Sequence, residues 1–270
     1  MPMLGFGVYQ IAKEDCERCV LDAIKVGYRH IDTAQIYGNE EEVGNAIVHC
    51  GLPREELFIT TKVWLTNYGY EQAKQSVLES LKKLKSEYID LVLLHQPYGY
   101  YYGAYHALQD LYKEKKIRAI GVSNFYPAPL ADIASFNEIP PHVNQVEVNP
   151  FHQQISAQVN MENRGVVMEA WAPFGEGRNN LFTNPTLQEI GKKYGKSNAQ
   201  VILRWLLQRG IVSLAKSTHI ERMLQNIEIF DFELSQEDMD TIVTLNSGAS
   251  LFHDHQSVEA IDRYASFVKK

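Results

Sequence analysis

The stretch EQAKQSVLESLKKLKSEYIDLVLLH, residues 71–95, shows the pattern that decides the fold. Its first part places Ala73, Val77 and Leu81 at helical spacing, which predicts an amphipathic helix over Glu71–Leu84. Its last part is a short apolar run, Asp90–His95, which predicts a buried strand. Helices that alternate with strands in this way are typical of proteins with a parallel sheet.

The same alternation runs through the chain on both sides of this stretch. Strands are predicted at Gly5–Tyr9, Arg29–Thr33, Leu57–Lys62, Asp90–His95, Ala119–Ser123, Val143–Glu147, Val166–Ala170 and Ile211–Ala215. Helices are predicted at Lys13–Val26, Glu40–His49, Glu71–Leu84, Tyr105–Glu114, Pro129–Phe136, Thr183–Tyr194, Ala199–Arg209 and Ser235–Leu245, with a short one running through Arg222 to Asn226. The tail after these helices is expected to be irregular, with two apolar-rich stretches.

Eight strand–helix units can close into a barrel or remain an open, doubly wound sheet. The sequence lacks the G-x-G-x-x-G of a dinucleotide-binding open sheet, which favours the barrel. Its 270 residues also suit one barrel domain. The predicted class is therefore α/β, a single (β/α)8 TIM barrel over residues 1–270, with extra helices before the last strand and near the carboxyl terminus.

Composition narrows the function classes. The formal net charge is −7, from 26 basic and 33 acidic residues, so a nucleic-acid partner is not expected. Three cysteines are too few for a disulfide framework, and no apolar run has membrane-spanning length. The amino terminus lacks the pattern of a signal peptide. A soluble protein of the cytoplasm, with no membrane partner, is expected.

Three consecutive predicted strands end in polar residues. Asp32, Lys62 and His95 stand at these ends, and Tyr37 follows Asp32 by five residues in the next loop. In a barrel, the carboxyl ends of the strands share one rim, where active sites lie. Taken alone, each residue has an ordinary structural explanation, such as a turn cap or a solvated strand end, but together they predict a site.

The four residues suit carbonyl reduction. Tyrosine is a weak acid, and an ammonium at Lys62 would lower the pKa of Tyr37 by favouring its phenolate. Asp32 would keep Lys62 charged, and His95 would orient the substrate carbonyl. No side chain can supply a hydride, so a cofactor is required.

The chain resembles the aldo-keto reductases over essentially its whole length. The motifs that carry the resemblance are LGFGVYQ (4–10), GYRHIDTA (27–34), YGNE (37–40), TKVW (61–64), LLHQP (93–97), IGVSNF (120–125), NQVE (144–147) and the pair Lys216-Ser217. By position, Asp32, Tyr37, Lys62 and His95 match the catalytic tetrad of that family, with Tyr37 as the acid.

The resemblance also implies a cofactor, NADPH. Ser123, Asn124 and Gln145 match residues that hold the nicotinamide carboxamide, and Trp171 stands where an aromatic ring stacks on the nicotinamide. Phe174, Gly175 and Arg178 would lie along the pyrophosphate. The segment matching the adenosine and 2′-phosphate site contains Lys216, Ser217, Thr218, Arg222, Gln225 and Asn226.

That last segment also has a physical argument of its own. Barrels often bind phosphate after strands seven and eight, and a lysine with a planar arginine near a helix start suits a phosphate dianion. NADPH is therefore favoured over NADH. Alternatively, Arg222 only pairs with Glu221 or Glu228 on a helix surface.

The substrate pocket is expected to include Tyr9, Trp64 and Tyr98, with Phe6 and Phe125 as further wall residues and Leu251 and Phe252 as a cover from the tail. The stretch Pro97–Gly103 is short, as in the microbial branch with 2,5-diketo-gluconate reductases and some prostaglandin F synthases. A short lid favours an open site and broad tolerance of aldehydes and diketones.

The chain departs from the family pattern in three places. The hairpin that usually plugs the bottom of the barrel is expected to be absent, because the chain begins at the first strand. Ala215 stands where proline is common, and Gln225 where glutamate is frequent. The sequence His253-Asp254-His255 has no other placed ligands, so no metal is expected.

Two alternatives to an NADPH-dependent aldehyde and ketone reductase remain. One is a non-catalytic, nucleotide-binding interaction protein on the same fold, since a fold does not fix a function. The other is a barrel enzyme that uses Lys62 as a Schiff-base nucleophile, although Asp32 would keep that lysine charged. A monomer is expected.

Overall fold

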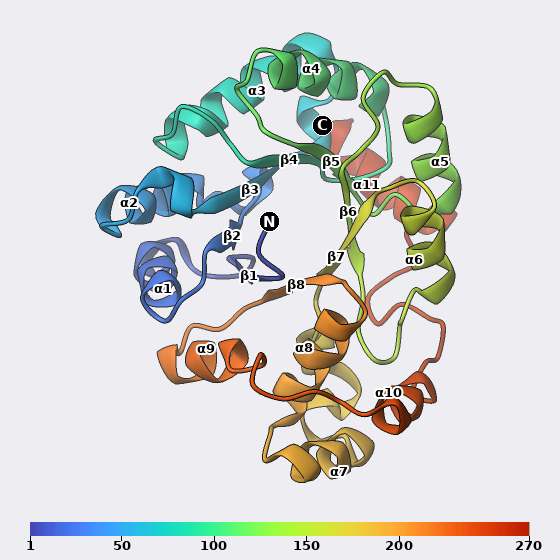
Figure 1. The fold of residues 1–270 in the computed structure, drawn as a ribbon. Coiled ribbons are helices and arrows are strands. Elements are labelled where there is room, and N and C mark those ends of the chain that lie inside the picture. Colours follow the sequence, from blue (N-terminus) through green and yellow to red (C-terminus); the bar gives the residue numbers. More distant parts are fainter. Residues whose placement is uncertain (270) are drawn as a thin grey trace.

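A computed structural model describes residues 1–269. Eight parallel strands pair in sequence order, and β8 pairs with β1, so the sheet closes into a barrel with the helices around it (Figure 1). The strands are β1 Leu4–Gly7, β2 His30–Asp32, β3 Phe58–Val63, β4 Leu91–Leu94, β5 Ile120–Ser123, β6 Val143–Glu147, β7 Val167–Trp171 and β8 Val212–Ala215. The predicted (β/α)8 barrel is confirmed.

The helices follow the strands in the expected alternation. They are α1 Lys13–Lys25, α2 Glu40–His49, α3 Tyr70–Lys83, α4 Tyr101–Lys113, α5 Pro127–Ser135, α6 Ile155–Glu162, α7 Pro185–Tyr194, α8 Asn198–Gln208, α9 Ile220–Ile227, α10 Gln236–Val243 and α11 Val258–Val268. Four 3₁₀ segments are η1 Gln35–Tyr37, η2 Arg54–Glu56, η3 Leu65–Asn67 and η4 Gly175–Thr183. Within residues 1–269, no helix is both long and apolar enough to cross a bilayer.

Strand β4 shows how the barrel is filled. Val92 and Leu94 belong to the main core, between strands and helices, whereas Leu91 and Leu93 form a separate buried cluster with Val143. Successive side chains of a strand point to opposite faces, so the second cluster lies on the inner face. The inner face is thus apolar on β4, whereas β2 and β7 bring the buried polar residues His30 and Glu169 into the barrel.

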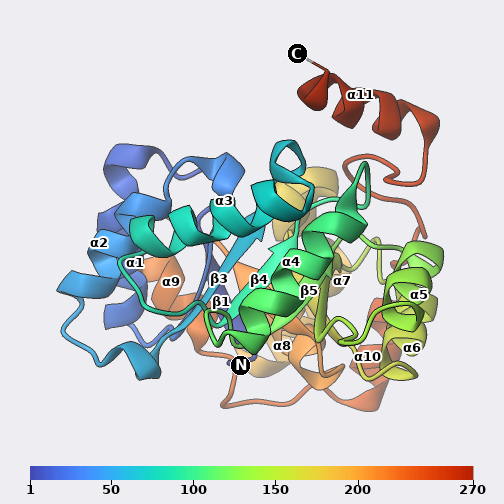
Figure 2. The same ribbon diagram turned by 90° about the horizontal axis from the view of Figure 1, so that it is seen from above.

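Two helices contradict the sequence-based expectations. The tail is not irregular, because α11 forms there with Ser257 as its N-cap, whose side chain accepts a hydrogen bond from the backbone N–H of Ala260. Helix α6 fills the connection between β6 and β7, where no helix was predicted. In addition, α4 begins at Tyr101, four residues earlier than expected. Figure 2 shows α11 at the opposite end of the molecule from the amino terminus.

Candidate active site

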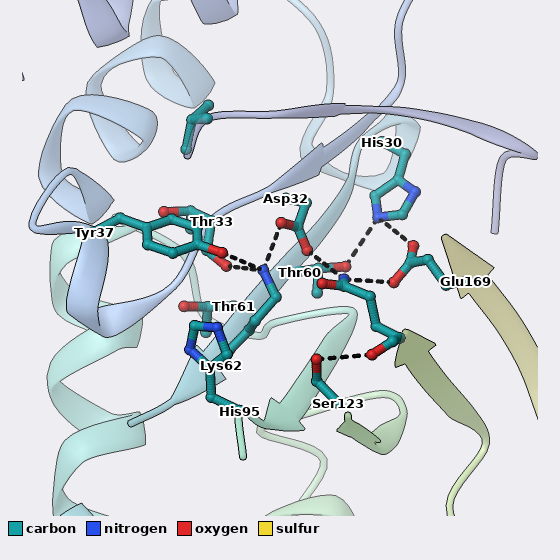
Figure 3. Close-up of polar contacts among 12 residues, drawn as sticks. His30, Asp32, Thr33, Tyr37, Thr60, Thr61, Lys62, His95, Ser123 and Glu169 are labelled. Carbon is teal, nitrogen blue, oxygen red and sulfur yellow. Dashed lines mark hydrogen bonds and ion pairs between the residues drawn. The ribbon is translucent and has the colours of Figure 1, made fainter. Parts of the chain in front are cut away.

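The tetrad residues meet at the carboxyl ends of β2, β3 and β4 (Figure 3). Asp32 is the last residue of β2, Lys62 is the next-to-last residue of β3, and His95 directly follows β4. Tyr37 ends the 3₁₀ turn η1, which brings its ring back over these strand ends. The three residues predicted from strand-end positions and Tyr37, predicted in the loop after β2, therefore lie together.

Lys62 is the centre of this group. It is fully buried, and its Nζ lies 2.5 Å from Asp32 Oδ1, 3.0 Å from the carbonyl oxygen of Thr33 and 3.4 Å from the Tyr37 hydroxyl. Burial lowers the pKa of Lys62, but the Asp32 carboxylate and the Tyr37 hydroxyl outweigh burial, and the net pKa is raised. The lysine therefore stays an ammonium, with all three N–H groups used.

Tyr37 differs from the expectation in one respect. Burial raises the pKa of Tyr37 to about 12, and the charge of Lys62 opposes this rise without reversing it. Lys62 lowers the pKa of Tyr37, as expected, but the expected net lowering is wrong. The free energy needed to remove the phenolate from water exceeds its favourable interaction with the Lys62 ammonium. Tyr37 therefore keeps its proton at neutral pH, as a proton donor must.

His95 is neutral in this environment. Burial, followed by the charge of Lys62, places the pKa of His95 well below its usual value. The ring lies edge-on to Tyr37, with centroids 5.8 Å apart, and its Nδ1 is buried without a hydrogen-bond partner among the described residues. A neutral imidazole beside the acid can hydrogen-bond to a carbonyl oxygen but does not compete with Tyr37 as the acid.

The residues expected around a nicotinamide lie next to the tetrad. The Ser123 hydroxyl donates to the backbone oxygen of Gln145 at 2.8 Å. Asn124 adopts a left-handed φ of 64°, donates to the backbone oxygen of His95 at 3.2 Å and accepts from the Trp171 indole at 2.9 Å. These bonds fix Asn124 and Trp171 relative to His95. The Gln145 side chain donates to Asp32 Oδ2 at 2.9 Å, so it reaches the tetrad directly.

The stretch expected along a pyrophosphate lies in η4. Gly175 has a φ of 53°, and a side chain there would meet Leu251 Cδ1 at 2.6 Å, so glycine is favoured. The Arg178 guanidinium lies 4.1 Å from the ring centroid of Phe252 and pairs with Glu176 at 2.7 Å. Leu251 and Phe252 therefore cover η4, on the expected cofactor side rather than over the substrate wall.

The segment after β8 is partly exposed, with Ser217 and Asn226 buried. Lys216 and Arg222 are exposed, and within residues 1–269 Arg222 forms no ion pair with Glu221 or Glu228. The Ser217 hydroxyl accepts from the backbone N–H of His219 at 3.1 Å, shaping the turn that leads into α9. The rest of the segment consists of Thr218, Gln225 and Asn226, and none of its residues hydrogen-bonds to the tetrad.

The expected substrate-wall residues divide into two groups. Tyr9 is 52% exposed and packs on Tyr37 with centroids 4.9 Å apart, and Trp64 lies edge-on to His95 at 5.1 Å. Tyr98 stacks on Tyr264 of α11 at 5.0 Å and donates to the backbone oxygen of His255.

Phe6 and Phe125, by contrast, belong to the core. Both are fully buried, Phe6 against Tyr28 and Phe125 against Tyr101, so they do not form the wall expected of them.

Three residues at the site were not identified from the sequence. Glu169 and His30 are fully buried inside the barrel, beside Asp32 and Lys62 (Figure 3). Tyr264 packs edge-on against Trp64, with centroids 6.2 Å apart. An acid in the middle of the apolar strand VVMEA was the available signal for Glu169. In residues 1–269, no group of three or more histidine, cysteine or acidic side chains is arranged to hold a metal.

Comparison with known proteins shows which family the chain belongs to. The sequence matches the profile of the Aldo/keto reductase family over residues 3–247. It is 47% identical to glyoxal reductase of Bacillus subtilis (strain 168), over 91% of this chain and 89% of that protein.

Two solved structures extend the match. A protein provisionally named 2,5-diketo-D-gluconic acid reductase B has a TM-score of 0.91 at 37% identity, over 95% of this chain and 92% of that one. An aldo-keto reductase of Bombyx mori, solved in complex with NADP, has a TM-score of 0.89 at 34% identity, over 98% and 94% of the two chains. The resemblance seen in the motifs is confirmed: this chain belongs to the aldo/keto reductase family, a family of oxidoreductases that act on carbonyl groups.

Proposed function

We propose that this protein reduces aldehydes and ketones to alcohols with NADPH and that Tyr37 is the general acid. The observation that carries the proposal is the position of Lys62 Nζ, which bridges the Asp32 carboxylate at 2.5 Å and the Tyr37 hydroxyl at 3.4 Å. A fixed positive charge beside a phenol matters most when that phenol loses its proton.

Each side chain of the tetrad has its own role in the proposed reaction. The hydride for the carbonyl carbon comes from bound NADPH. Tyr37 gives its proton to the carbonyl oxygen, and Lys62 stabilises the phenolate that this transfer leaves behind. His95, neutral and next to Tyr37, hydrogen-bonds to the same oxygen and orients it. Asp32 holds Lys62 charged and in place.

The described residues fit NADPH in two places. Next to the tetrad, Asn124 and Trp171 are locked together by a hydrogen bond of 2.9 Å, and Trp171 is only partly buried, which leaves a ring for a nicotinamide to stack on. At the rim, Lys216 and Arg222 are exposed cations with no acid paired to Arg222 in the described chain. Two free cations near a helix start suit a 2′-phosphate, and the likeness to a reductase that binds NADP agrees with this.

We propose small aldehydes and dicarbonyl compounds as substrates. The proposed wall consists of Tyr9 on Tyr37, Trp64 on His95 and Tyr98, which reaches Trp64 through Tyr264. The similarity to a glyoxal reductase favours the same class of carbonyl. Three free cysteines, Cys16, Cys19 and Cys50, suit the reducing cytoplasm that the sequence suggested.

The test of this proposal removes one group, the hydroxyl of Tyr37. Tyr37→Phe removes the acid and keeps the ring, so turnover of NADPH with glyoxal or a simple aldehyde is expected to fall by about 10²–10⁴-fold. Tyr112→Phe, on α4 and packed against His142, is the matched control and is expected to keep its activity. Undiminished turnover in Tyr37→Phe would remove the acid role. Nucleotide binding without turnover in the parent protein would favour a non-catalytic role, and turnover without NADPH would favour Schiff-base chemistry.

A further inference from the structure

Glu169 lies inside the barrel, beside the tetrad and on the side of Asp32 away from Tyr37 (Figure 3). It is a residue of β7 and pairs in register with Gln145 of β6. Its exposed fraction is zero. From β2, His30 Nε2 lies 3.7 Å from Glu169 Oε1 and 3.0 Å from the Thr60 hydroxyl. The tetrad mechanism assigns no role to this acid.

One amide connects Glu169 to the tetrad. Gln145 Nε2 donates to Glu169 Oε2 at 2.7 Å and to Asp32 Oδ2 at 2.9 Å, so both of its N–H groups are used. Lys62 contacts only the Asp32 end of this chain of hydrogen bonds. The interior group, defined as His30, Asp32, Lys62, Gln145 and Glu169, therefore contains two carboxyl groups and one ammonium.

The charge balance of the interior group requires one proton. Two buried carboxylates with one ammonium would leave an uncompensated negative charge, which is costly away from water. Burial raises the pKa of Asp32 as well, but Asp32 lies 2.5 Å from the Lys62 ammonium, whereas Glu169 touches no cation, so the single proton belongs on Glu169. Burial and then the charge of Asp32 raise the pKa of Glu169 to about 8.

Neither of the other neighbours supplies the missing positive charge. Burial and then Lys62 lower the pKa of His30 to about 3, with a further contribution from the ammonium of the amino terminus. Strand β8, the other neighbour of Glu169, pairs Val212 with it and brings no charge. Glu169 Oε1 has no hydrogen-bond partner among the described residues, so a proton on this oxygen displaces no existing bond and faces His30.

We propose that Glu169 is a positioning residue that is neutral at neutral pH and controls, through Gln145 and Asp32, the charge that Lys62 and Tyr37 experience. Loss of its proton adds a second negative charge near Lys62. That charge favours the ammonium and disfavours the Tyr37 phenolate, so Tyr37 becomes a weaker acid. Reduction should then decline as the pH rises through 8, below the range in which Tyr37 itself titrates. This inference rests on the proposed acid role of Tyr37.

The pH profile of kcat/KM tests the proposal. Glu169→Gln keeps the size of the side chain and its oxygen acceptor but has no proton to lose. Between pH 7 and 9 the parent protein is expected to lose activity, on the order of threefold or more, whereas Glu169→Gln holds its rate. Glu79→Gln, a surface change of the same charge, is expected to follow the parent. A decline with the same midpoint in Glu169→Gln, or an equal loss at every pH, overturns the proposal.

A second measurement does not depend on activity or on folding of the variant. Infrared difference spectra of the parent protein, titrated from pH 6 to 10, are expected to show the C=O band of a neutral carboxylic acid that disappears with a midpoint near 8. If no such band titrates, Glu169 is not the proposed acid. If the band is present but Tyr37→Phe remains active, the proposed function fails while the assignment of the proton stands.

Discussion

The buried proton on Glu169 makes a quantitative prediction about stability. We compare the free energy of unfolding of Glu169→Gln with that of the parent protein as the pH rises. The ordinary pKa of this group is 4.5, and in the folded protein burial and Asp32 raise the pKa to about 8. Between these values the folded parent holds a proton that the unfolded chain has released, so the parent loses stability as the pH rises.

The size of the effect follows from that interval. One pKa unit corresponds to about 1.4 kcal/mol, so the interval of Glu169 corresponds to about 5 kcal/mol. Glu169→Gln does not titrate. Its stability relative to the parent is therefore expected to increase by about 5 kcal/mol from pH 4.5 to pH 8 and to stay constant at higher pH.

Urea titrations at half-unit pH steps measure this difference. The two proteins bury the same surface, so the same dependence on urea applies to both, and the midpoint difference reports stability. The surface control Glu79→Gln is expected to show no comparable rise. A difference between Glu169→Gln and the parent that stays within about 1 kcal/mol over the whole range would show that Glu169 is ionised when folded. If the stability of Glu169→Gln relative to the parent fell as the pH rises, folding would lower the pKa of Glu169 instead of raising it.

Three further predictions concern the cofactor, the cover of the site and the packing. Arg222→Ala is expected to weaken NADPH binding by about 1.5–3 kcal/mol and leave NADH unchanged, as measured by fluorescence titration; equal losses for both would exclude a 2′-phosphate contact. Tyr264→Ala removes the ring packed on Trp64 and should raise the KM for aldehydes more than it lowers kcat, as measured by steady-state kinetics. An unchanged KM would contradict a role for α11 on the substrate side. Gly44→Ala places a Cβ 2.1 Å from the backbone oxygen of Lys83 and should lower the free energy of unfolding by about 1–3 kcal/mol. In the control Gly7→Ala, the nearest atom to the new Cβ is 3.9 Å away, so the loss should be smaller. Similar urea midpoints for the two variants would refute the packing argument.

Most of the barrel was predictable because its strands and helices carry their own periodicity. The exceptions show where that signal fails. Helix α6 buries only Ala157 and Met161, so its apolar pattern is too weak to indicate a helix. Helix α11 had a local signal, the Ser257 cap, but the aromatic residues that hold it in place, Tyr264 and Phe267, pack on Trp64, about 200 positions earlier. Tertiary contacts of this kind cannot be read from a local pattern.

The candidate site was likewise predictable only in part. Strand-end position was enough to predict that Asp32, Lys62 and His95 lie together, because parallel strands of a barrel share one rim. The net pKa of Tyr37 was predicted in the wrong direction, since its burial depends on how η1 folds over the barrel. Glu169 was missed because an isolated acid in a strand gains meaning only from the residues of β2 and β6 that the closed barrel places beside it.

The residues of the tetrad and those predicted to hold the cofactor lie in separate parts of the sequence. The tetrad lies within the first 95 residues, on β2 to β4, whereas every residue predicted to hold the cofactor follows residue 120. Hybrids between relatives that exchange partners within α4 would therefore combine the acid chemistry of one parent with the nucleotide preference of the other. The Gln145–Asp32 hydrogen bond spans 113 positions across that junction, so it is a contact that such hybrids must preserve.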